Sequence, residues 1–147
     1  MGFKNDQLDQ LKRIHHQVTY RFEYKNDIEL WGKIEHWDDD FTIMNAVTNG
    51  LRWKGDCEET AKAFLLLALP LGLNGRLVVG YDETGQGHCW TEIASEDLEE
   101  AIYLDNRRST AVARNRLYGY LPVAASPWNP VPGDTRPWIA LRQEKIA

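Results

Sequence analysis

The segment GDCEETAKAFLLLALPLGL, residues 55–73, predicts the central helix of the fold. Gly55 or Asp56 precedes a run of strong helix formers, and acidic side chains occupy the first turn. Pro70 and Gly72 predict where the helix ends. The middle of the run, AFLLLAL, is apolar on every side, so we expect neighbouring elements to bury this helix.

Three short segments after this helix carry the branched and aromatic residues typical of β-strands. They are RLVVGYD at 76–82, HCWTEIA at 88–94 and AIYLDNR at 101–107. The connections ETGQG and SEDLEE are short enough for an antiparallel meander. One buried helix packed on an antiparallel sheet is an α+β fold, which is the fold class that we predict.

The flanking segments predict further elements. Apolar residues at helical spacing indicate an amphipathic helix from Asn5 to about Glu23, with Asn5 or Asp6 as its cap. Acidic residues followed by a glycine indicate a short helix from Asp39 to Thr48. The proline-rich tail predicts an ordered loop that wraps the body before a last strand over 138–142.

Composition restricts the class of protein. The 147 residues are 43% hydrophobic and contain no repeat or linker, so we expect a single domain over residues 1–147. A net charge of −5 offers no general attraction for nucleic acid or an anionic membrane. Two cysteines are too few for a disulfide framework and suit a reducing compartment. We therefore expect a cytoplasmic protein, or a periplasmic one if an export signal has been removed, and the oligomeric state stays unknown.

Cys57 is the candidate nucleophile because it falls in the first turn of the buried helix. The unpaired N–H groups and the positive end of the helix dipole favour a thiolate there, so we predict a lowered pKa for this thiol. The same N–H groups would also stabilise an oxyanion formed by attack on an acyl carbon.

His88 and Asp105 are the candidate base and the residue that orients it. His88 opens the second strand and Asp105 lies near the end of the third, so antiparallel pairing brings them together. If they are directly opposite, their side chains share one face of the sheet, about 5 Å apart at Cβ. Together with Cys57 they predict the nucleophile, base and orienting group of covalent catalysis.

Other residues near these three have competing interpretations. Cys89 should point to the opposite face from His88 and lie in the core. Because adjacent strand residues diverge and no paired ligand motif is present, the sequence argues against a zinc site formed by Cys57, His88 and Cys89. Trp37 and Trp53 either pack in the core or line a substrate cleft. The negative charges of Asp56, Glu58 and Glu59 oppose a thiolate at Cys57. Either a bound calcium ion neutralises them, or solvent and the helix dipole suffice.

These motifs resemble those of the bacterial transglutaminase-like cysteine proteinases, the LapG-like family. The likeness runs from about Tyr20 to Arg107 and rests on GDCEET before the buried helix, a histidine strand, and YLDNR. The segment DIELWGKIEHWDDD before the nucleophile is also similar to that family. The resemblance implies a papain-like or transglutaminase-like core, a catalytic triad at Cys57, His88 and Asp105, and calcium ligands at Asp56 and Glu58.

The resemblance implies a cysteine peptidase or amidase that acts on a protein or peptide substrate through a thioester acyl-enzyme. Two alternatives stay open at this point. A protein-glutamine transglutaminase or deamidase would use the same intermediate, and a non-catalytic binding module would keep the fold without turnover. A compact cytosolic or phage-encoded relative is as compatible with the sequence as a periplasmic protease.

Overall fold

The central helix has the position and ends that the sequence predicts. The computed structural model describes residues 2–20, 22–24, 44–45, 47–51, 53–107, 112–113, 119–131 and 133–141. The helix α4 spans Cys57–Ala68 and continues into a 3₁₀ helix, η1, over Leu69–Leu71. Gly72 ends this run in the left-handed conformation, with a φ of 79° that suits glycine.

An antiparallel sheet forms the second layer. Within the described residues this sheet has six strands, in the order β6-β5-β4-β3-β7-β8. The predicted meander is its centre and consists of β3 (Asn74–Tyr81), β4 (Gly87–Ala94) and β5 (Ala101–Leu104). The outer strands are β6 (Val112–Ala113), β7 (Leu121–Ala125) and β8 (Ile139–Ala140).

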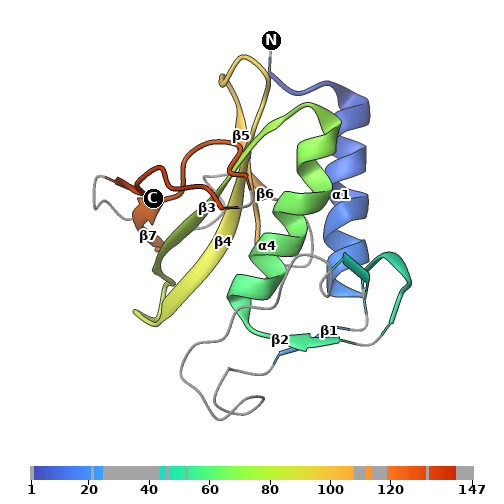
Figure 1. Ribbon diagram of the computed structural model, residues 1–147, viewed down its shortest axis with the longest axis horizontal. Coiled ribbons are helices and arrows are strands. Elements are labelled where there is room, and N and C mark those ends of the chain that lie inside the picture. The colour runs from blue at the N-terminus through green and yellow to red at the C-terminus, as the bar shows by residue number, and fades with distance from the viewer. Residues whose placement is uncertain are drawn as a thin grey trace.

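Two helices cover one face of this sheet. Figure 1 shows α4 next to β3 and β4, with α1 (Asn5–Thr19) beside it. The main hydrophobic cluster joins both helices to the sheet, since it contains Leu11, Phe64, Ile93 and Leu104. The α+β fold class is therefore confirmed. Among the described residues, no helix combines the length and apolar character needed to cross a lipid bilayer.

The sequence-based boundaries of the flanking helices need correction. The helix α1 ends at Thr19, not near Glu23, because Phe22–Tyr24 form strand β1, which pairs in parallel with β2 (Trp53–Gly55). Its N-cap is Lys4, whose backbone N–H donates to the Gln7 side chain. Of the predicted helix over 39–48, residues 44–45 and 47–48 are helical and the others lie outside the described residues.

The strand β7 is absent from the sequence-based prediction, which placed a loop there. It pairs with β3 on the side away from β4, and the pairing contains an irregularity between Val79 and Gly80. Pro122 lies opposite Gly80 at this irregularity, which is where a strand tolerates proline. A Cβ at Gly80 would lie 2.0 Å from the carbonyl oxygen of Leu121, so the two backbones can approach only because residue 80 is glycine.

Candidate active site

Cys57 is the first residue of α4 and directly follows the cap residue Asp56. Its half-buried side chain packs against the cluster of Ala61, Leu65, Leu77 and Cys89. The backbone N–H of Cys89, at the beginning of β4, lowers the pKa of the Cys57 thiol. The nucleophile candidate is thus held between the beginning of α4 and the beginning of β4.

His88 and Asp105 are in direct contact. The Nε2 atom of His88 donates to Oδ1 of Asp105 over 2.7 Å, and both side chains are fully buried. The strand register differs from the predicted one by two residues, because Thr91 pairs with Leu104. A shift of an even number of residues leaves both side chains on the same face, so the contact forms although the predicted register is wrong.

Asp105 is held at every oxygen atom. The Tyr120 hydroxyl donates to Oδ2 over 2.6 Å, and the backbone N–H of Arg107 donates to Oδ1 over 3.2 Å. The ring of His15, from α1, donates through Nε2 to the Asp105 carbonyl over 2.9 Å. Burial by itself raises the pKa of Asp105, but the hydrogen bond and charge of His88, together with Tyr120 and Arg107, lower the pKa below its ordinary value. The carboxylate is therefore ionised at neutral pH.

Arg107 connects this carboxylate to the turn between β3 and β4. Its guanidinium pairs with the buried Asp82, which also accepts hydrogen bonds from the backbone N–H groups of Thr84 and Gln86. Burial raises the pKa of Asp82, but the hydrogen bonds from Thr84, Gln86 and Arg107 outweigh it and lower the pKa to about 2. The loop that follows Asp105 is thus fixed to the turn that precedes His88.

One pocket brings the nucleophile candidate and the base candidate together. A cavity of about 470 Å³ is lined by Cys57, Glu58, His88 and Cys89, and Gly87 with residues of β3 and β7 forms the rest of its wall. The second ring nitrogen of His88, Nδ1, is buried and has no hydrogen-bond partner among the described residues. Since Asp105 occupies Nε2, Nδ1 is the atom of His88 that remains able to take a proton.

The pKa of Cys57 differs from the sequence-based prediction. Burial raises it, and the neighbouring carboxylate of Asp56 raises it further, to about 12. The hydrogen bond from the Cys89 backbone lowers the pKa by less. The thiol therefore does not have the lowered pKa that the sequence predicts, because lost solvation and the charge of Asp56 both raise it. Cys57 is a neutral thiol at neutral pH, and a base must take its proton before it can act as a nucleophile.

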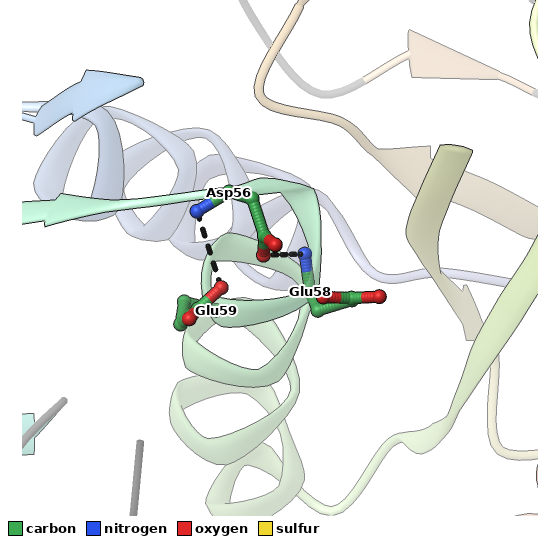
Figure 2. Close-up of side chains that lie close together, drawn as sticks. All are labelled: Asp56, Glu58 and Glu59. Atoms are coloured by element: carbon green, nitrogen blue, oxygen red, sulfur yellow. Dashed lines mark hydrogen bonds between the residues drawn. The ribbon is translucent and has the colours of Figure 1, made fainter. Parts of the chain in front are cut away.

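Three carboxylates surround the beginning of α4 (Figure 2). Asp56 accepts from the Glu58 backbone N–H over 3.0 Å, and Glu59 accepts from the Asp56 backbone N–H over 3.1 Å. One oxygen from each of the three residues can be chosen so that all lie within 4.8 Å of one another. Burial, together with the hydrogen bond and charge of Asp56, raises the pKa of Glu59 to about 9.

This carboxylate group fits a hard cation in its chemistry. All of its donors are oxygen atoms, which Ca²⁺ prefers. The Oε1 atom of the buried Glu59 has no hydrogen-bond partner among the described residues, so it has an acceptor position to offer. The family resemblance implies Asp56 and Glu58 as ligands, and the carboxyl group of Glu59 lies in the same cluster.

The structure describes only some of the other residues that the sequence singles out. Trp37 lies outside the described residues, and the backbone of Trp53 belongs to β2. Cys89 is buried in the core as predicted, and it also contributes to the wall of the pocket. The sequence-based interpretation missed His15 and Tyr120, because neither lies in a motif and their contacts with Asp105 depend on the tertiary fold.

Comparisons with known proteins agree with this fold. A family model, the transglutaminase-like superfamily, matches residues 1–108. The chain is similar to EGTA-treated LapG of Legionella pneumophila, with a TM-score of 0.63 and 19% identity, over 82% of this chain and 63% of that chain. Calcium-bound LapG gives a TM-score of 0.61 and 18% identity, over 95% of this chain and 78% of that chain. A comparison with curated proteins finds no match.

These similarities establish the family and the fold. The chain spans less than two thirds of the EGTA-treated LapG chain, and identities below 20% show a shared fold alone. The match over residues 1–108 covers the helix α4 and the strands that carry His88 and precede Asp105. The suspected relationship is thereby confirmed, and this protein belongs to the transglutaminase-like superfamily.

Proposed function

We propose that this protein is a cysteine peptidase or amidase that acts on a protein or peptide substrate. The observation that carries the proposal is the hydrogen bond between His88 Nε2 and Asp105 Oδ1, in a histidine that lines the same pocket as Cys57. Among the described residues, Nδ1 of this histidine has no hydrogen-bond partner. In this proposal Cys57 is the nucleophile, His88 is the general base and acid, and Asp105 orients the ring.

Acyl transfer would follow from these positions. Nδ1 of His88 takes the thiol proton while the Cys57 sulfur attacks the carbonyl carbon of the substrate. The backbone N–H of Cys57, at the first position of α4, has no acceptor within the helix and is a donor for the oxyanion. His88 then gives its proton to the leaving amine as the C–N bond breaks, and a thioester remains on Cys57.

Hydrolysis completes the cycle. His88 Nδ1 takes a proton from a water molecule while the water oxygen attacks the thioester. The C–S bond then breaks, His88 returns the proton to the Cys57 sulfur, and a carboxylic acid is released. If an amine attacks the same thioester, the product is a new amide and the enzyme is a transglutaminase. The family match supports this second reaction as the close alternative.

Product analysis tests the proposal and separates the two reactions. A denatured protein mixture is incubated with the native protein or with Cys57→Ala, with and without a biotinylated primary amine, and is then analysed by mass spectrometry. We expect new amino termini that depend on Cys57. Glutamine side chains that carry the amine would show a transglutaminase instead. If both products are absent at every calcium concentration, the result would contradict an enzyme and favour a binding module.

We also propose that Asp56, Glu58 and Glu59 bind calcium. A bound Ca²⁺ would place positive charge beside Cys57 and offset the negative field of Asp56 and Glu58. The similarity to a LapG structure described as calcium-bound supports this proposal, together with the three clustered carboxylates.

Calcium should stabilise the fold measurably. A ligand that binds only the folded state at 100 times its Kd adds about 2.7 kcal/mol to the free energy of unfolding. We expect calcium chloride to raise the Tm of the native protein, measured by scanning calorimetry, and Glu58→Gln to reduce this rise. The matched control Glu96→Gln removes an exposed carboxylate from the turn after β4 and should keep the full rise. An equal rise in both variants would place the calcium elsewhere.

A further inference from the structure

Tyr120 is a fully buried tyrosine that no sequence motif singles out. It directly precedes β7, and its hydroxyl donates to Oδ2 of Asp105 over 2.6 Å. Its ring meets the ring of His88 edge-on, with the centroids 5.9 Å apart and the planes at 81°. One residue from outside the β3-β4-β5 meander thus touches both partners of the His88–Asp105 pair.

We propose that Tyr120 is a positioning residue, which fixes the Asp105 carboxylate and thereby holds the proton of His88 on Nε2. This inference rests on the proposed function, because it concerns how the same pair is made ready to act. The pocket that Cys57 and His88 line is formed by other residues than Tyr120, and in this proposal Tyr120 takes no part in bond making.

The two oxygens of Asp105 have separate donors. Oδ1 accepts from His88 Nε2 and from the Arg107 backbone, whereas Oδ2 accepts from Tyr120. A buried carboxylate oxygen without a donor is unfavourable, so loss of the Tyr120 hydroxyl would let the carboxylate rotate or share its remaining donors. His88 would then lose its fixed acceptor at Nε2, and the tautomer with the proton on Nδ1 would become populated.

The tautomer decides whether His88 can act as a base toward the pocket. Nδ1 must be unprotonated to take the thiol proton of Cys57, and this requires the neutral ring to keep its proton on Nε2. The edge contact with the Tyr120 ring also restricts rotation of the imidazole. Both contacts favour the same orientation of His88.

The test compares Tyr120→Phe with the matched control Tyr103→Phe. Tyr103 is a second buried tyrosine of the same aromatic cluster and packs edge-on against Trp90, with the ring centroids 6.1 Å apart. Both changes remove one buried hydroxyl and keep the ring. The readouts are the ¹⁵N resonances of the His88 ring, which report its tautomer, and the rate of Cys57 alkylation by iodoacetamide at neutral pH.

We expect Tyr120→Phe to populate the Nδ1–H tautomer and to slow alkylation about three- to tenfold, the effect of one hydrogen bond. Tyr103→Phe should keep the native tautomer and rate. In an Asp105→Ala background, Tyr120→Phe should have no further effect on the rate, because the group it positions is gone. An unchanged tautomer in Tyr120→Phe, or an equal loss of rate in the Asp105→Ala background, would overturn the proposal.

A second variant decides the matter if Tyr120→Phe does not fold. Fluorotyrosine at position 120 keeps the shape of the side chain and makes the hydroxyl a stronger donor to Asp105. The low-field proton resonance of His88 Nε2–H should then move, and an unmoved resonance would overturn the proposal. These spectra need no turnover, so a failure of the peptidase proposal is seen separately, as an absence of Cys57-dependent products.

Discussion

Replacing His88 with alanine is expected to slow the alkylation of Cys57 by iodoacetamide about 100-fold at neutral pH. Burial and Asp56 raise the pKa of Cys57 to about 12, so very little thiolate exists at neutral pH without a base. His88 lines the same pocket as Cys57, and among the described residues its Nδ1 has no hydrogen-bond partner, so the substitution removes the proposed acceptor of the thiol proton. The rate is measured by mass spectrometry of the peptide that contains Cys57.

The pH dependence of the alkylation rate should differ between the native protein and His88→Ala. A thiol with a raised pKa gains thiolate about tenfold per pH unit below that pKa. In His88→Ala the alkylation rate should therefore rise steeply up to a pH of about 12, whereas the native protein should show a second, faster contribution near neutral pH. Cys57→Ala measures the background from the buried Cys89, and His16→Ala removes an exposed histidine as the matched control. Equal profiles in the native protein and His88→Ala would contradict a Cys57–His88 pair.

The central layer of the fold can be predicted because its signals are local. The helix α4 has a capping residue, a run of helix formers and a glycine exit within one continuous segment. The strands β3, β4 and β5 follow it with short connections, which leave antiparallel pairing as the simple solution. Each of these features is encoded by neighbouring residues, so a single sequence suffices.

The outer elements depend on contacts that the sequence does not display. The strands β1 and β2 pair although 28 residues separate them in the sequence. Most of these intervening residues lie outside the described part of the chain. The strand β7 contains Pro122, which argues against a strand unless the partner has a bulge and a glycine at the same place. Gly80 is the glycine that lies opposite Pro122, but this becomes visible only when β3 and β7 are paired.

In the candidate site, too, local features can be predicted from the sequence and tertiary contacts cannot. Cys57, His88 and Asp105 can be chosen from their places on predicted elements, and the structure joins two of them directly and places Cys57 with His88 in one pocket. Tyr120 and His15 contact Asp105 across 15 and 90 residues of sequence, and no periodicity indicates such contacts. The direction of the Cys57 pKa shift could not be predicted, because it depends on how deeply the sulfur is buried.

The substitution Asp105→Asn is expected to reduce the reactivity of Cys57 as strongly as the loss of His88, about 100-fold, while the histidine remains in place. An asparagine has one acceptor oxygen and one donor amide, whereas the native carboxylate accepts from His88, Arg107 and Tyr120 at once. If the amide faces His88, Nε2 must accept, and the ring proton moves to Nδ1.

That tautomer points a proton into the pocket, where a base is needed, so His88 is present but unable to act. The rate of Cys57 alkylation measures the loss of reactivity, and the ¹⁵N resonances of His88 measure the change of tautomer. Asp97→Asn, in the turn after β4, is the control for the loss of one negative charge and should leave both unchanged. Adding His88→Ala to Asp105→Asn should slow the reaction no further, because both changes remove the same proton acceptor. A large additional loss in the double variant would mean that His88 acts without Asp105, and the carboxylate would then be a structural residue.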